Sequence, residues 1–233
     1  MASKHIDRQK QVAARAAVEL VQPGMAVGLG HGSTVQFALE ALAEQLASGV
    51  LSDVVGVPAS KASAAAARAL EIPLADLDEH PRLDLAIDGA DEVDPSFNLI
   101  KGGGGALLRE KMLAQASRRF VVIVDAGKLS PKLGTQFALP LEVLPFGWKS
   151  QLNFLAHLGG DVKLRVDQSG EPVLSDQGNY LLDCAFGPIE DLAELASLLA
   201  ERAGILEHGL FLGLATDVCV GTDEGIQKHS VKA

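Results

Sequence analysis

The chain has 233 residues, of which 48% are hydrophobic and 21% charged, a composition typical of a globular protein with an ample core. Its formal net charge of −10 argues against nucleic acid or an anionic membrane as the main partner. The polar segment MASKHIDRQKQ lacks the apolar core of a signal peptide, and no uninterrupted apolar run of about 18 residues predicts a membrane span.

The cysteines and histidines indicate a reducing compartment and no bound metal. Cys184 and Cys219 lie far apart in the sequence, as is typical of free thiols in a cytoplasmic protein. The six histidines show none of the spacings typical of metal ligands. We therefore expect a cytoplasmic protein that binds neither a metal nor another cofactor.

The first half of the chain alternates strand and helix patterns. Apolar runs predict strands at residues 25–30, 53–57, 83–88 and 120–126. Helical periodicity predicts helices at residues 10–21, 33–48, 59–70 and 106–117. This alternation predicts an α/β domain in which helices cover both faces of a parallel sheet.

After Pro131 the pattern changes to that of a smaller α+β unit. Strands are predicted at residues 136–145, 161–166, 180–186 and 209–215, and helices at residues 148–158 and 189–202. We expect a small domain with an antiparallel sheet at residues 135–206, inserted before a C-terminal segment that returns to the first domain. The α/β domain would then comprise residues 1–134 and 207–233.

A glycine-rich turn, GLGHGST (28–34), joins the first predicted strand to the next helix. Glycines let a backbone approach a ligand closely, and the free amides at a helix start attract an anion. Ser33 or Thr34 is the expected N-cap of this helix. The turn does not have the full dinucleotide pattern GxGxxG, so it predicts either a phosphate site or an ordinary strand-to-helix turn.

Four acids follow the strand that ends at Asp88, in the segment IDGADEVD (87–94). Ligands bind at the carboxyl edge of open α/β sheets, so Asp88 and Asp91 are candidates for acid–base chemistry. The alternative is a solvated acidic loop.

The segment KGGGGALLRE (101–110) places four glycines between Lys101 and a predicted helix. The glycines predict a nest of backbone amides, and Lys101 is placed to stabilise a developing oxyanion. The helix is apolar nearly all round, which predicts a buried Glu110 suited to act as a base. Alternatively, Glu110 pairs with a neighbouring basic residue on an exposed strip.

Lys128 lies in the loop DAGKLSPKLG (125–134), which follows another strand of the same sheet. The four loops together supply a phosphate cradle, acids, an oxyanion-stabilising lysine and a base. This combination fits proton transfer on a small phosphorylated carbonyl compound, because signatures of a nucleophile are missing.

These segments, together with GLFLGLATDVCVGTDEG near the C-terminus, resemble in order and spacing the signature segments of the type A ribose-5-phosphate isomerase family. The resemblance covers essentially the whole chain. It implies a metal-free aldose–ketose isomerase of the pentose phosphate pathway that interconverts D-ribose 5-phosphate and D-ribulose 5-phosphate through an enediolate. It also implies a homodimer or homotetramer with a sugar phosphate as its partner.

The resemblance also implies residue roles. Glu110 would move a proton between C1 and C2, Asp88 would carry a proton between O1 and O2 with help from Asp91, and Lys101 would stabilise the enediolate oxygen. The implied substrate contacts are His31, Gly32, Ser33, Thr34, Asp88, Gly89, Ala90, Asp91, Lys101, Gly102, Gly103, Gly104 and Lys128, with Lys10 as a further phosphate contact. His31 is a departure, because the family usually has Thr there.

Two other interpretations share parts of this pattern. A coenzyme A transferase or an amino-sugar phosphate deaminase has a related fold, but a transferase needs a glutamate nucleophile and a larger site. A sugar-phosphate sensor usually carries a DNA-binding helix-turn-helix, for which this chain has neither a further domain nor a basic charge.

Overall fold

The computed structural model describes residues 2–230. Contacts group the chain into two compact units, the first comprising Met1–Ala90, Arg109–Lys128 and Gly213–Ala233 and the second comprising Asp91–Leu108 and Leu129–Leu212. Residues 91–108 group with the second unit in this structure, whereas the expected division places them in the α/β domain. The expected domain limits stay a prediction.

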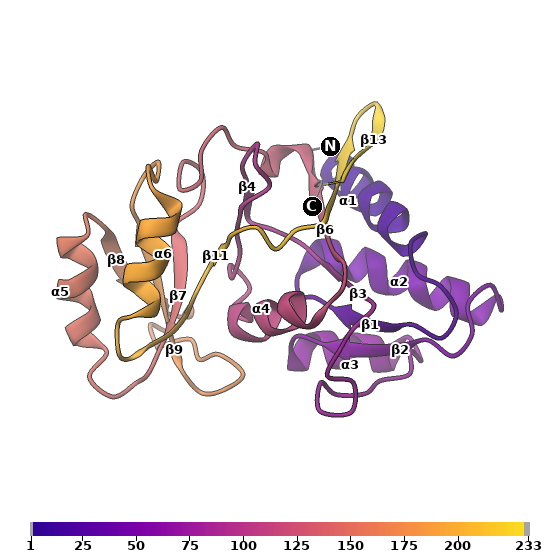
Figure 1. Cartoon of the computed structure of the whole chain (residues 1–233), viewed down its shortest axis with the longest axis horizontal. Helices are drawn as coiled ribbons and strands as arrows, with labels where there is room; N and C mark the ends of the chain where they lie inside the picture. Colours follow the sequence, from indigo (N-terminus) through magenta and orange to yellow (C-terminus); the bar gives the residue numbers. More distant parts are fainter. Residues whose placement is uncertain (1, 231–233) are drawn as a thin grey trace. The chain divides into compact units, whose positions relative to one another are not determined.

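The first unit contains a six-stranded sheet in the order β13-β12-β6-β3-β1-β2 (Figure 1). Neighbouring strands are parallel except for the antiparallel pair β12 and β13. The strands are β1 (Ala26–Leu29), β2 (Val55–Pro58), β3 (Leu85–Asp88), β6 (Phe120–Asp125), β12 (Asp217–Thr222) and β13 (Gly225–Ser230). Because β1, β3 and β6 run in parallel, their carboxyl ends lie at one edge of the sheet, which is where α/β proteins place ligands.

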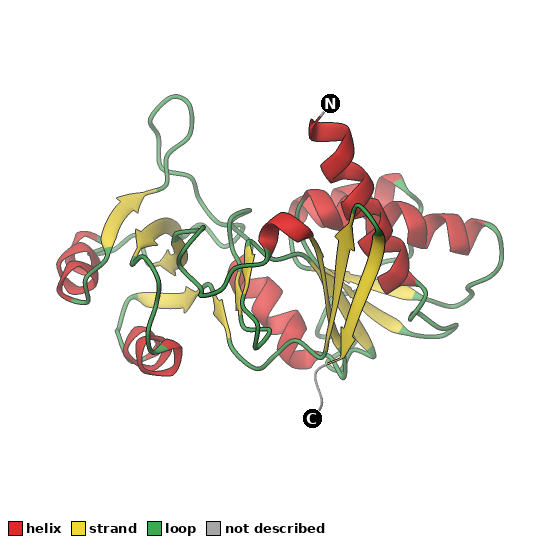
Figure 2. Ribbon diagram, turned by 90° about the horizontal axis from the view of Figure 1, so that it is seen from above, coloured by secondary structure: helices red, strands yellow, loops and turns green. Residues whose placement is uncertain are grey.

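Helices pack on both faces of this sheet (Figure 2). The helical segments of the sheet unit are α1 (Ala2–Val18), α2 (Ser33–Ala47), α3 (Lys61–Ala69), α4 (Leu107–Ala116) and the short 3₁₀-helix η1 (Ala126–Lys128). Val27 packs with α1 and α2 in the main core, whereas the adjacent Ala26 packs with Leu113 of α4. Successive strand residues point to opposite faces, so the predicted two-sided α/β architecture is confirmed.

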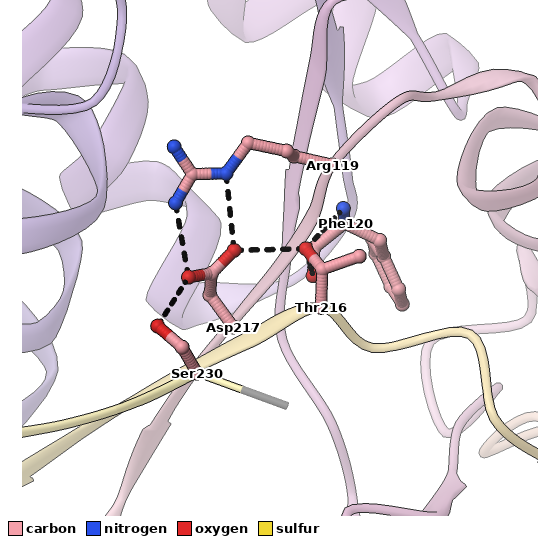
Figure 3. A network of polar contacts seen from close by, with 5 residues as sticks. All are labelled: Arg119, Phe120, Thr216, Asp217 and Ser230. Atoms are coloured by element: carbon pink, nitrogen blue, oxygen red, sulfur yellow. Dashed lines mark hydrogen bonds and ion pairs between the residues drawn. The ribbon is translucent and has the colours of Figure 1, made fainter. Parts of the chain in front are cut away.

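A polar network joins the start of β6 to the start of β12 (Figure 3). Arg119 donates to both carboxylate oxygens of Asp217, with N···O distances of 3.1 and 2.9 Å, and the hydroxyls of Thr216 and Ser230 also donate to this carboxylate. Burial raises the pKa of Asp217, but the hydrogen bonds from Arg119, Thr216 and Ser230 outweigh it and hold the pKa below its ordinary value. The network therefore favours the ionised carboxylate and fixes the register of this parallel pair.

The second unit contains two antiparallel sheets. The four-stranded sheet has the order β10-β7-β9-β8, and the three-stranded sheet has the order β11-β5-β4. Their elements are β4 (Glu92–Val93), β5 (Leu99–Ile100), β7 (Leu139–Val143), α5 (Lys149–His157), β8 (Asp161–Leu164), β9 (Tyr180–Ala185), α6 (Leu192–Ala200), β10 (Ile205–His208) and β11 (Leu210–Phe211). The predicted antiparallel α+β unit is thus confirmed, with a small extra sheet.

The C-terminal part of the prediction needs a correction. Residues 209–215 do not form one strand; only Leu210–Phe211 is a strand, and it pairs with β5. Gly213 follows with a φ of 63°, a left-handed conformation that ends an extended segment. The strand that joins the main sheet is β12, next to β6.

Two further findings concern the cysteines and the helices. Both cysteines are free and buried, and burial raises the pKa of Cys184 to about 12 and that of Cys219 to about 11. Among the described residues, no helix combines the length and the apolar character that crossing a bilayer requires.

Candidate active site

The turn between β1 and α2 leaves the first amides of the helix without a side-chain cap. Gly32 is the N-cap, with a φ of 113°, and α2 begins at Ser33. The prediction of Ser33 or Thr34 as the N-cap is therefore wrong, because the left-handed φ places glycine at that position. Uncapped amides at a helix start can bind an anion directly.

Lys10 on α1 reaches the same turn. Its Nζ atom donates a hydrogen bond to the Ser33 hydroxyl over 3.0 Å, although the two residues are 23 positions apart. The Lys10 ammonium group and an uncapped helix start thus lie together. Both favour a negatively charged group at this turn.

Asp88 ends β3 and is only 2% exposed. Its Oδ1 accepts hydrogen bonds from the backbone amides of His31, over 3.1 Å, and of Gly89, over 2.7 Å. Gly30 makes room for this carboxylate, because a Cβ atom at Gly30 would lie 2.1 Å from the Asp88 Cγ atom. The structure thus joins the glycine turn of β1 to the acid loop of β3.

The His31 ring points to a different partner. Its Nδ1 atom lies 2.9 Å from the hydroxyl oxygen of Ser60, the N-cap of α3. The ring and its neighbours Gly32, Ser33 and Ser63 also line a cavity of about 240 Å³ between α2 and α3.

Glu110 lies in the first turn of α4 and is 4% exposed. The predicted burial of this carboxylate is therefore confirmed, and the alternative of an exposed strip is excluded. Met112 on the same helix is 47% exposed, so α4 is not buried all round as its composition suggested.

Lys128 ends η1, directly after β6, and is half-buried. Asp125, the last residue of β6, is 6% exposed and accepts the Gly127 amide over 3.0 Å. This bond shapes the turn that carries Lys128 and holds the lysine at the carboxyl end of a parallel strand.

The second unit carries the remaining acids, and they have separate roles. Asp91 accepts the Gly103 amide over 2.7 Å. Glu92 is fully buried and accepts the backbone amides of residues 134, 136 and 137. Asp94 accepts the amides of Ser96 and Asn98 within its own turn. Glu92 and Asp94 are therefore structural, and Asp91 is the acid that contacts the glycine run.

The glycine run forms a tight turn in which several amides are already used. Gly102 and Gly105 have φ values of 105° and 81°, and the Gly105 amide donates to the Gly102 carbonyl over 2.9 Å. A Cβ atom at Gly103 would lie 2.7 Å from Asp91 Oδ1. Since the amides of Gly103 and Gly105 are engaged within the unit, the predicted nest needs correction: they do not point freely at a ligand.

Lys101 precedes this turn and is 2% exposed. Its Nζ atom lies 5.5 Å from the centre of the Phe211 ring, within the range of a cation–π contact. Its backbone amide donates to the Gly209 carbonyl over 2.9 Å. The side chain is thus buried, with its ammonium group near an aromatic ring.

Comparison with known proteins identifies the family. Residues 55–225 match the family model of ribose 5-phosphate isomerase A (phosphoriboisomerase A). The chain belongs to this family. A ribose-5-phosphate isomerase A of Chloroflexus aurantiacus is 58% identical over 221 residues, covering 95% of this chain and 92% of that protein.

Solved structures agree with this assignment. The ribose 5-phosphate isomerase of Plasmodium falciparum superposes with a TM-score of 0.94 at 38% identity, covering 97% of this chain and 100% of that one. A D-ribose-5-phosphate isomerase in complex with phospho-erythronic acid also gives a TM-score of 0.94 at 38% identity, covering 97% of this chain and 99% of that one.

In this ribose-5-phosphate isomerase A chain, the sequence did not predict the role of Arg165. Arg165 donates through Nη1 to the carbonyls of Gly102 and Gly103, over 3.1 and 3.0 Å, and through Nε and Nη2 to Asp183, over 2.9 and 2.5 Å. It clamps the glycine turn from a segment about 60 positions away. No local pattern marks it, because its partners are backbone carbonyls brought near by the fold.

Proposed function

We propose that this protein interconverts D-ribose 5-phosphate and D-ribulose 5-phosphate through an enediolate, as part of the pentose phosphate pathway. Membership of the ribose 5-phosphate isomerase A family supports the reaction. The observation that carries the mechanism is the burial of two carboxylates, Asp88 and Glu110, which are 2% and 4% exposed. A buried carboxylate can transfer a proton to or from a bound substrate without competition from bulk water.

In the proposed reaction Glu110 removes the proton from C2 of the open-chain aldose, and the electrons of that bond move to give an enediolate with its charge on O1. The Lys101 ammonium group stabilises this charge, as an oxyanion partner does. Asp88 then carries the proton from O2 to O1, and Asp91 assists at the sugar hydroxyls. Glu110 returns its proton to C1, which yields the ketose and restores the carboxylate.

The phosphate of the substrate is proposed to bind at residues 31–34. The absence of a side-chain cap on α2 supports this site, as does the Lys10 ammonium group 3.0 Å from the Ser33 hydroxyl. Lys128 is proposed as a further contact. Phospho-erythronic acid is the molecule bound by a solved relative, and it combines a phosphate with a planar carboxylate that resembles an enediolate in shape and charge.

The remaining proposed substrate contacts lie in two loops. They come from the loop after β3 and from the glycine turn, namely Gly89, Ala90, Gly102, Gly103 and Gly104. We also propose that the protein acts in the cytoplasm as a homodimer or homotetramer, without a cofactor and without nucleic acid or a membrane as partner. The net charge of −10 supports the last point.

The direct test mixes ribose 5-phosphate with protein that has been treated exhaustively with EDTA and follows formation of the ketose. We expect turnover without added metal. Glu110→Gln is the matched variant, since it keeps the shape of the side chain but removes the base; its kcat should fall by about 10²–10⁴ while KM changes little. No ketose from the wild-type protein, or activity that one divalent ion restores, would overturn the proposal. A variant that keeps more than about a tenth of kcat would exclude Glu110 as the base.

A further inference from the structure

A chain of hydrogen bonds connects the His31 ring to a backbone carbonyl. The His31 Nδ1 atom lies 2.9 Å from Ser60 Oγ, and Ser60 Oγ lies 2.9 Å from Ser63 Oγ. Ser63 Oγ lies 2.5 Å from the Gly30 carbonyl oxygen. Ser60 and Ser63 are 4% and 5% exposed, so they depend on these protein partners rather than on bulk water.

The position of each proton in this chain of hydrogen bonds follows from the bond between Ser63 and Gly30. A carbonyl oxygen only accepts, so the single Ser63 hydroxyl proton points at Gly30. The Ser60 proton must then be donated to Ser63. Ser60 Oγ also accepts the Ser63 amide over 2.9 Å, which leaves it one acceptor position for the ring. His31 Nδ1 must therefore carry a proton and donate it to Ser60.

We propose that Ser60 and Ser63 are positioning residues that keep His31 Nδ1 as a permanent donor, so that Nε2 is the ring nitrogen that gains or loses a proton. The neutral ring then offers only a lone pair at Nε2, and the charged ring offers an N–H group. Within the described residues, Nε2 makes no hydrogen bond.

The functional consequence rests on the phosphate site proposed above. The oxygens of a phosphate dianion only accept hydrogen bonds, so a contact with Nε2 requires one extra proton on the ring or on the phosphate. Loss of this proton at high pH removes the contact. The elements around this turn carry charged groups that include Asp88 at the end of β3, Lys10 on α1, Glu40 on α2 and Lys61 at the start of α3. They are the same in the variants compared below.

The tautomer is measured in the free protein by long-range ¹H–¹⁵N correlation of the histidine rings, with His31→Thr used to assign the signals. Two other histidines serve as internal references. His157 Nδ1 faces the Asn153 carbonyl and must donate, whereas His208 Nδ1 accepts the Leu210 amide. At a pH where the rings are neutral, we expect the His31 ring to show the Nδ1–H pattern of His157. The Nδ1–H tautomer should outnumber the Nε2–H tautomer by at least about tenfold. The Nε2–H pattern of His208 would overturn the inference.

Ser63→Ala tests the role of the chain in catalysis. Without Ser63 the Ser60 proton can turn to Nδ1, which admits the Nε2–H tautomer and gives the neutral ring a donor for phosphate. We expect a mixed tautomer pattern, an unchanged kcat, and a rise in KM for ribose 5-phosphate between about pH 6 and 8 that is about threefold smaller than in the wild type. A merely structural loss would raise KM at every pH instead, and that result would overturn the inference.

Two further variants complete the experiment. Ser63→Thr keeps the hydroxyl and should restore the wild-type tautomer and pH profile, whereas Ser52→Ala, at an exposed position, should change neither. If the wild type shows the Nδ1–H pattern but does not isomerise ribose 5-phosphate, the proposed function fails and the positioning stands. If it isomerises but shows the Nε2–H pattern, the positioning fails and the function stands.

Discussion

Replacing Gly30 by Ala should displace the Asp88 carboxylate without straining the backbone. The added Cβ atom would lie 2.1 Å from Asp88 Cγ and 2.2 Å from Oδ1. Ordinary contacts begin near 3.4 Å, so the carboxyl carbon must retreat by the difference, about 1.3 Å. Gly30 is not among the residues with positive φ, so backbone strain adds little.

The size of the effect follows from what the carboxylate loses. Its Oδ1 accepts two backbone amides, at 3.1 and 2.7 Å, and hydrogen bonds to a charged group contribute about 1.5–3 kcal/mol each. Solvent replaces part of this, so we expect a loss of roughly 2–4 kcal/mol in the free energy of unfolding. A catalytic group misplaced by about 1 Å costs about 10²-fold in rate, so kcat/KM should fall by about that factor.

The assays are urea unfolding and the coupled measurement of ribulose 5-phosphate formation. Gly49→Ala is the matched control, because Gly49 follows α2 with a φ of 74° and its Cβ atom would have no neighbour within 4 Å. It should cost about 1 kcal/mol through its left-handed backbone and leave kcat unchanged. If Gly30→Ala keeps kcat/KM within about threefold of the wild type, the position of Asp88 does not limit the reaction.

Three other substitutions give distinct signatures. Lys101→Ala should raise the kcat barrier by about 3 kcal/mol, the effect of losing one oxyanion partner, whereas a large rise in KM at constant kcat would make Lys101 a ground-state binder. His31→Thr should give a KM that rises less steeply than that of the wild type between about pH 6 and 8, because a hydroxyl donates at any pH, whereas His31 Nε2 donates only when the ring is charged; parallel profiles would show that His31 does not contact phosphate. Arg165→Met should lower the free energy of unfolding by roughly 2 kcal/mol and kcat by about tenfold, measured by urea melts and turnover, because the two carbonyls and Asp183 lose their shared donor; full activity would show that the glycine turn holds its shape alone.

Much of the fold was accessible from the sequence because its main strands are apolar and its helices periodic. β1, β3 and β6 are buried along their whole length, which is the pattern that continuous apolar runs predict. The two-residue strands β4 and β5 were missed because so short a segment has no period, and β11 was predicted as part of a longer strand at residues 209–215. The C-terminal β12 was missed because the preceding Leu- and Gly-rich segment looked more like a strand.

In the candidate site, too, some features could be predicted from the sequence and others could not. Burial of Glu110 could be predicted because its helix is apolar nearly all round, whereas for Asp88 the sequence predicted only a place at the carboxyl edge of the sheet. The partners of other site residues could not be predicted. Ser60 contacts His31, and Arg165 contacts Gly102, only because the fold brings these distant segments together. Local propensity was also wrong at the start of α2, where a left-handed backbone required Gly32 rather than a hydroxyl cap.

In the glycine turn, Arg165 and Asp91 place opposite charges at the two ends of one peptide group. The peptide group between Gly102 and Gly103 points its carbonyl at the Arg165 guanidinium and its amide hydrogen at the Asp91 carboxylate. A cation at one end and an anion at the other both align with the dipole of this single peptide, and each polarises it in the same sense. The charge of Arg165 is thereby felt at Asp91 through one peptide plane. A substitution at Arg165 is therefore also an electrostatic change at an acid whose own side chain is left intact.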